Sequence, residues 1–147
     1  MFENESSTVT ELLVTIEEQT SYRGVNFIMK LSVIKKFHFC YGHYLPKYDG
    51  KCKNIHGHNS VLEVEVSGTN AYEYDGMVID FVKLKSIVSP VLEKFDHTFL
   101  NNFMDVPTAE NIAQFFYIEI QKRLPIGNVL ERIKITETED SWAEVKR

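Results

Sequence analysis

The strongest structural signal in this chain is the stretch of residues 52–66, which reads CKNIHGHNSVLEVEV. Its second half alternates apolar and charged residues from Leu62 to Val66, and this pattern predicts a half-buried β-strand. Side chains two residues apart on a strand point to the same face, so we expect His56 and His58 to lie side by side. Two imidazoles placed in this way can coordinate one metal ion.

A third histidine, His43, lies upstream of this stretch. It lies near the start of residues 41–54, which contain Gly42, Pro46, Asp49 and Gly50 and are therefore predicted to be a loop. Three imidazoles with one open position are the usual ligand set of a catalytic zinc ion. The thiol of Cys52, four residues before His56, then becomes a candidate general base beside the metal.

A closed structural zinc site is the alternative interpretation of the same residues. It pairs Cys40-x2-His43 with Cys52-x3-His56 as a two-cysteine, two-histidine site. This interpretation leaves His58 without a role.

Length and composition exclude several classes of protein. The 147 residues predict one domain, and the 44% hydrophobic and 25% charged shares are typical of soluble globular proteins. No run approaches the roughly 18 apolar residues that a membrane helix needs. The first ten residues lack the features of a signal peptide, so we expect a cytoplasmic protein whose two cysteines need not form a disulfide.

The net charge of −5 argues against general nucleic-acid binding, although the charge is unevenly spread. Six lysines and a single acid, Asp49, lie between Lys30 and Lys53. This basic segment either attracts an anionic substrate such as a phosphate ester or is an ordinary solvated loop.

The remaining elements predict an α+β fold. A strand over residues 25–39 and a strand over residues 56–68 are followed by two helices with helical spacing of apolar residues, and then by two short strands. The expected bounds are residues 81–95 for a helix capped by Asp80, residues 108–124 for the second helix, and residues 131–138 and 142–145 for the last strands. This order predicts a four-stranded antiparallel sheet with two helices on one face.

The first 24 residues are expected to be an N-terminal extension of a domain that covers residues 25–147. Within the extension, residues 8–17 fit either an added strand or a short helix. The two free edges of a four-stranded sheet invite pairing with other chains, so we expect a homo-oligomer.

Six short motifs occur in a fixed order along the chain. They are Phe39-Cys-Tyr-Gly-His43, Cys52-x3-His56-Gly-His58, Gly76-Met-Val-Ile-Asp80-Phe81, Asp96-His97-Thr-Phe-Leu100-Asn101, Pro107-Thr-Ala-Glu110-Asn111 and Thr136-Glu137-Thr138. In this order they resemble the 6-pyruvoyltetrahydropterin synthase / 6-carboxytetrahydropterin synthase family over about residues 25–145. The extension and the Cys-Tyr-Gly sequence before His43 depart from the family pattern, in which small residues are more common at that position.

The resemblance implies the tunnelling fold (T-fold), in which subunits join their sheets into a barrel and trimers stack into a homo-hexamer. It also implies that Zn²⁺ is held by His43, His56 and His58. Cys52 would act as the general base of the reaction.

The resemblance further implies that Asp96 and His97 form an acid/base relay, completed across a subunit boundary. Because adjacent residues cannot share one strand face, we expect this pair in a loop after the first helix. Glu137 matches the family's pterin anchor, since a carboxylate can accept two parallel hydrogen bonds from a pterin. Thr108 and Glu110 either contribute to the pterin pocket or serve as the cap and the first turn of the second helix.

The activity implied is the conversion of 7,8-dihydroneopterin triphosphate to 6-carboxy-5,6,7,8-tetrahydropterin, with release of acetaldehyde and triphosphate, in 7-deazaguanine (queuosine) synthesis. The alternative within the family is 6-pyruvoyltetrahydropterin synthase, which shares the substrate, the metal and the base. An alternative from another class is a non-catalytic zinc-binding oligomer.

Overall fold

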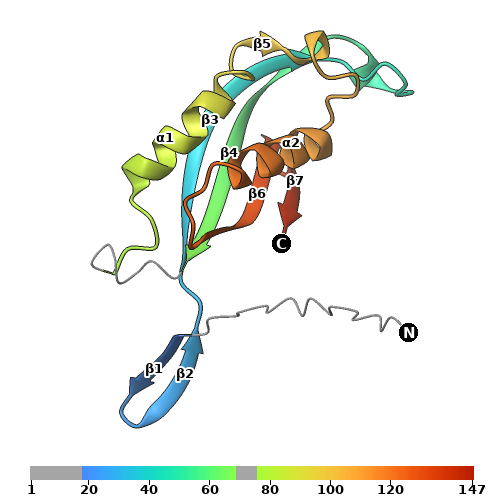
Figure 1. Cartoon of the computed structure of the whole chain (residues 1–147). Helices are drawn as coiled ribbons and strands as arrows, with labels where there is room; N and C mark the ends of the chain where they lie inside the picture. Colours follow the sequence, from blue (N-terminus) through green and yellow to red (C-terminus); the bar gives the residue numbers. More distant parts are fainter. Residues whose placement is uncertain (1–17, 69–75) are drawn as a thin grey trace, which may run out of the picture. The chain divides into compact units, whose positions relative to one another are not determined.

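The structure is a computed structural model that describes residues 18–68 and 76–147 (Figure 1). The chain divides into two compact units, Met1–Lys30 and Leu31–Arg147. In the first unit, strands β1 (Glu18–Tyr22) and β2 (Val25–Met29) form an antiparallel hairpin. Its two turn residues, Arg23 and Gly24, both have positive φ, as tight two-residue hairpin turns require. The alternatives for residues 8–17 lie outside the described residues.

The hairpin divides the first expected strand in two. Instead of one strand over residues 25–39, the chain forms β2 and then β3 (Ser32–His43), which belong to different sheets. Because residues 25–29 pair with residues 18–22, the larger unit begins at Leu31, six residues after the boundary expected from the sequence.

The larger unit is built on a five-stranded sheet with the order β5-β3-β4-β6-β7. Strand β3 pairs antiparallel with β4 (His56–Gly68), β4 with β6 (Asn128–Thr138), and β6 with β7 (Ser141–Lys146). The fifth strand, β5 (Thr98–Phe99), pairs parallel with β3. The prediction of four strands was therefore short by one, because a two-residue strand has no periodicity to detect.

Two capped helices follow β4 in the chain. Helix α1 (Phe81–Leu92) begins after Asp80, whose carboxylate accepts the Val82 N–H at 2.8 Å, and this confirms the predicted cap. It ends at Leu92, before the expected residue 95, and the chain then turns through residues 93–97. Helix α2 (Ala109–Gln121) begins after Thr108 and is likewise shorter than expected. Among the described residues, the unit also contains two short 3₁₀ turns, Lys51–Lys53 and Leu100–Asn102.

Both helices cover the same face of the sheet, as predicted (Figure 1). Alternate residues of the strands are buried beneath them, among them Phe37, Phe39, Tyr41, Leu62, Val64, Val66, Ile133 and Ile135. The aromatic ring of Phe116 from α2 lies 4.6 Å from that of Phe95 and 5.9 Å from that of Phe39, measured between ring centroids. The core thus joins β3, α2 and the turn after α1.

We expect Phe116→Ala to lower the free energy of unfolding by about 3–5 kcal/mol, because a fully buried ring is removed and a cavity remains. Urea denaturation at constant zinc concentration measures the change. Val82→Ala, at a position that is 74% exposed, is the matched control and should change stability by less than about 0.5 kcal/mol. Equal effects of the two variants would contradict this account of the core.

Candidate metal site

Strands β3 and β4 bring the three predicted histidines together. The antiparallel register places His43 directly opposite His56, and His58 opposite Tyr41. These residues continue the alternation that buries Phe37, Phe39, Leu62 and Val64, so they lie on the face covered by the helices. The loop predicted over residues 41–54 was wrong at its start, because β3 continues to His43 through its pairing with residues 56–58.

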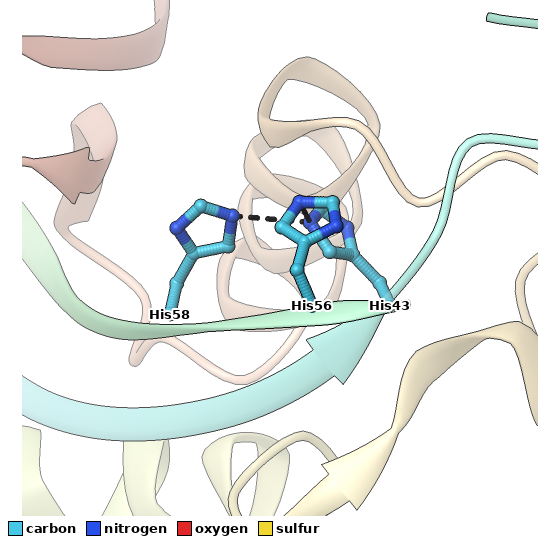
Figure 2. A group of neighbouring side chains, drawn as sticks. All are labelled: His43, His56 and His58. Carbon is cyan, nitrogen blue, oxygen red and sulfur yellow. Dashed lines mark hydrogen bonds between the residues drawn. The ribbon is translucent and has the colours of Figure 1, made fainter. Parts of the chain in front are cut away.

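The imidazoles of His43, His56 and His58 point toward one another (Figure 2). The Nε2 atom of His43 lies 3.0 Å from Nε2 of His56 and 3.1 Å from Nε2 of His58. The side chain of His43 is buried, and those of His56 and His58 are partly exposed. Three ring nitrogens from two adjacent strands therefore converge on one point.

Two backbone carbonyls determine which ring nitrogen of His43 and of His56 is free to bind a metal ion. The Nδ1 atom of His43 lies 2.7 Å from the Pro107 carbonyl oxygen, and Nδ1 of His56 lies 2.8 Å from the Asn54 carbonyl oxygen. A carbonyl only accepts, so each Nδ1 donates, and in the neutral ring each Nε2 keeps its lone pair. Burial lowers the pKa of His43, which favours this neutral form.

Lone pairs that face each other at 3.0 Å repel unless a cation lies between them. Zinc–nitrogen bonds of about 2.0–2.1 Å at a tetrahedral angle separate two ligand nitrogens by about 3.3 Å, close to the spacing found here. The cluster therefore fits a metal ion. The carbonyl oxygens of Pro107 and Asn54 orient two of its three rings through their Nδ1 atoms.

Tyr41 and Glu137 lie beside this cluster. The Tyr41 hydroxyl donates to Glu137 Oε1 at 2.8 Å, and the same carboxylate oxygen lies 3.9 Å from Nε2 of His58. Burial and the neighbouring Glu137 raise the pKa of Tyr41, so its phenol stays protonated as a donor. Sequence reasoning identified Glu137 but missed Tyr41, although Tyr41 precedes His43 by two residues and so shares its strand face.

Cys52 lies in the 3₁₀ turn between β3 and β4 and is half-buried. Its carbonyl accepts the Leu45 N–H at 2.8 Å, which closes the base of this loop. In the part of the chain that the structure describes, Cys52 belongs to neither group of residues close enough to share one ion. The Cys52 thiol is therefore not among the ligand atoms that converge with the three imidazoles.

The structure contradicts the alternative interpretation, a closed zinc site with two cysteines and two histidines. Cys40 and His43 are an odd number of residues apart on one strand, so their side chains point to opposite faces of the sheet. Cys40 lies instead with Asp96 and His97.

Asp96 and His97 occupy the turn after α1, as predicted. The Asp96 Oδ1 atom lies 3.0 Å from His97 Nδ1 and accepts the backbone N–H of Cys40 at 2.9 Å. This N–H lowers the pKa of the Asp96 carboxyl, and the imidazole of His97 adds to the effect. Within one chain, the pair thus lies beside Cys40 and not with the three histidines.

The N-terminus of α2 approaches the metal cluster through Pro107, whose carbonyl meets His43. Thr108 Oγ1 accepts the Asn111 N–H at 3.3 Å, so its capping role is confirmed. Glu110 is exposed in the first turn of the helix. Among these residues it is Pro107, directly before Thr108, that contacts the cluster.

We expect Thr108→Ala to lower the free energy of unfolding by about 1 kcal/mol, because the cap at the start of α2 is lost. Thermal denaturation of the zinc-loaded protein measures this. Thr108→Ser retains a capping hydroxyl and should restore most of the stability. A KM that rises in Thr108→Ala with no change in stability would instead assign Thr108 to substrate binding.

The sheet, the two helices on one face and the converging histidines define an α+β protein in which three histidines are placed so that they could hold one metal ion. Residues 32–147 match the sequence profile described as 6-pyruvoyl tetrahydropterin synthase. The chain belongs to the 6-pyruvoyl tetrahydropterin synthase family, as the order of its motifs predicted, and its fold is the T-fold.

Three relatives illustrate the range of this family. A protein of Archaeoglobus fulgidus named "Putative 6-carboxy-5,6,7,8-tetrahydropterin synthase" is 42% identical over 109 residues, covering 74% of this chain and 90% of that protein. The dihydroneopterin monophosphate aldolase of Pyrococcus furiosus is 39% identical over 94 residues, covering 64% of this chain and 80% of the aldolase. The solved structure of Caenorhabditis elegans 6-pyruvoyl tetrahydropterin synthase superposes with a TM-score of 0.72 at 29% identity, covering 81% of this chain and 96% of the other.

No helix among residues 18–68 and 76–147 is long and apolar enough to span a membrane.

Proposed function

We propose that this protein is a zinc-dependent lyase that converts 7,8-dihydroneopterin triphosphate to 6-carboxy-5,6,7,8-tetrahydropterin, acetaldehyde and triphosphate. Its product would enter cytoplasmic 7-deazaguanine (queuosine) synthesis. The observation that carries the proposal is the convergence of three histidine Nε2 atoms, two of them on rings oriented by backbone carbonyls. The name of the Archaeoglobus fulgidus relative supports the carboxy product.

The histidine cluster would hold zinc with one position left for substrate. A bound zinc ion supplies Lewis acidity to hydroxyl oxygens of the substrate side chain, which eases loss of a proton from the adjacent carbon. His43 and His56 keep their Nε2 lone pairs available because their Nδ1 atoms donate to carbonyl oxygens.

Cys52 would take the substrate proton as general base. It lies between Lys51 and Lys53 in the 3₁₀ turn before β4. Asp96 would orient the His97 imidazole, which would return a proton to the substrate.

Glu137 would bind the pterin, with Tyr41 holding one carboxylate oxygen in place. Thr108 and Glu110 would line the pocket on the side where α2 meets the cluster. Three lysines of the segment between β3 and β4, Lys47, Lys51 and Lys53, would attract the triphosphate.

A complete site would need two copies of the chain. Because Cys52 and the Asp96–His97 pair lie in separate places within one chain, we place the pair of one protomer next to Cys52 of another, in a homo-hexamer made of two trimers. Strand β7 pairs with β6 on one side only and is the last strand of the described sheet. Its outer edge, where Trp142 is 53% exposed, would join the sheet of another protomer.

Product analysis tests the proposal. The zinc-loaded protein is incubated with 7,8-dihydroneopterin triphosphate, and the pterin and aldehyde products are identified by mass spectrometry. A carboxy-pterin with acetaldehyde supports the proposal, whereas a pyruvoyl-pterin would assign the chain to the other branch of the family. A parallel incubation with dihydroneopterin monophosphate tests the activity named for the Pyrococcus furiosus relative. Absence of turnover in folded, zinc-loaded protein would favour a non-catalytic zinc-binding oligomer.

A further inference from the structure

A second group of metal-ligating side chains lies on the face of the sheet opposite the three histidines. The Cys40 thiol, the Asp96 carboxylate and the His97 imidazole each place a ligand atom within 4.8 Å of the other two. We refer to these three residues as the Cys40 cluster. Its members come from two segments, the middle of β3 and the turn after α1.

Backbone hydrogen bonds hold the two segments together. The Cys40 N–H donates to Asp96 Oδ1 at 2.9 Å, and the His97 N–H donates to the Cys40 carbonyl at 2.7 Å. His97 itself has a positive φ of 56°, a conformation that histidine tolerates better than bulky residues do. The turn is thus fastened to β3 at both of its cluster residues, and this keeps the three ligand atoms close together.

The sheet leaves open space beside the Cys40 cluster. A hollow of about 390 Å³ is lined by Cys40, Asn59, His97 and Thr98, and by two glycines that face each other across the strands, Gly42 and Gly57. No side chain rises from this glycine pair, and a Cβ atom at Gly57 would lie 2.9 Å from the Tyr41 carbonyl oxygen. Within one chain, the His97 side chain is 79% exposed, and the hollow beside it leaves room for an ion.

We infer that the Cys40 cluster is a second Zn²⁺ site, distinct from the three-histidine site, and that its occupancy inhibits the enzyme. Thiolate, imidazole and carboxylate are the three ligand types that zinc takes from proteins, and water from the hollow would complete four-coordination. Binding replaces the thiol proton of Cys40, which passes to solvent, and no oxidation or reduction is involved.

The inhibitory part of the inference rests on the proposed function. An imidazole and a carboxylate bound to a metal ion cannot exchange protons with substrate, so zinc on Cys40 would withdraw Asp96 and His97 from their relay. Zinc would then be required at the three-histidine site and inhibitory in excess.

Cobalt substitution tests the second site without relying on activity. Co²⁺ is added stepwise to the metal-free, full-length protein while the thiolate-to-cobalt charge-transfer absorption is recorded. We expect the first equivalent to bind without this absorption, at the three histidines, and a second equivalent to produce it. Cys40→Ser should show neither the absorption nor binding of the second equivalent of Co²⁺. Cys52→Ser should show both.

A second variant protects the test against a folding defect. His97→Asn retains a residue that tolerates positive φ and should weaken the second Co²⁺ site by at least about tenfold. The inference would be overturned if the folded wild-type protein bound only one equivalent of Co²⁺. It would also be overturned if Cys52→Ser abolished the charge-transfer absorption and Cys40→Ser did not.

Turnover in excess zinc tests the regulatory part separately. Cys40→Ser should have the wild-type rate at one equivalent of zinc and should resist inhibition by added zinc. Inhibition of equal strength in both proteins would overturn the regulatory claim. A second cobalt site in a protein without any turnover would leave the metal site standing and refute the proposed function instead.

Discussion

We expect Cys52→Ala to lower kcat by about 10²–10⁴-fold, the usual contribution of a general base, and to leave the zinc content unchanged. The two effects separate because Cys52 is not among the residues that converge on the metal position. The substitution would remove the proposed proton acceptor but none of the three imidazoles. Product formation by mass spectrometry and metal content by elemental analysis measure the two quantities on one preparation.

Cys40→Ala is the matched control for this result. Both cysteines are free and half-buried, but Cys40 faces the opposite side of the sheet from the histidines. We expect its turnover at one equivalent of zinc to equal that of the wild type. Full turnover in Cys52→Ala would remove the thiol from the mechanism, and loss of zinc in that variant would make Cys52 a ligand.

We expect His58→Ala to abolish turnover, because it removes one of the three proposed zinc ligands. Zinc affinity should fall by more than the roughly 10–100-fold that loss of an outer hydrogen-bond partner costs. His58 is a better test than His43, since loss of the buried His43 ring would also leave the Pro107 carbonyl without its partner. Competition with a chromophoric chelator measures the affinity, and circular dichroism checks the fold.

The control for this variant is His38→Ala. His38 lies on the same strand as His43 but is exposed and points away from the cluster. We expect unchanged zinc affinity and unchanged turnover. If His58→Ala bound zinc as tightly as His38→Ala, the three-histidine site would be refuted.

Both results bear on how the active site is assembled. The metal cluster and Cys52 belong to the β3–β4 end of one chain, and the Asp96–His97 pair is fastened to the other face of β3. Mixing Cys52→Ala with His97→Ala protomers offers a direct check of a shared site, because hybrid oligomers would regain some intact sites. Recovery of turnover on mixing supports a site shared between subunits.

Local signals in the sequence were sufficient for several features. Alternation from Leu62 to Val66 predicted β4, and it placed His56 and His58 on one face, because the two-residue period of a strand depends only on neighbouring residues. Asp80 and Thr108 predicted the starts of both helices, since a cap acts within three residues of its own position. The order of six motifs predicted the family.

Other features depend on residues that are distant in the sequence, and only the tertiary structure decided them. Pairing with residues 56–58 keeps Tyr41, Gly42 and His43 in β3, although their own composition indicates a loop. The same pairing turns Cys40 away from His43, which excludes the closed zinc site. Hairpin formation by residues 18–29 moves the start of the larger unit to Leu31.

The contacts that complete the site join partners 56 to 96 residues apart: Cys40 with Asp96, His43 with Pro107, and Tyr41 with Glu137. A short window of sequence cannot show these contacts, because strand register and the packing of α2 against the sheet create them. The sequence by itself therefore determined which residues can carry the chemistry. The tertiary structure decided which of them meet, because hydrogen bonds and metal ligation require atoms within about 3 Å of each other, whatever their separation along the chain.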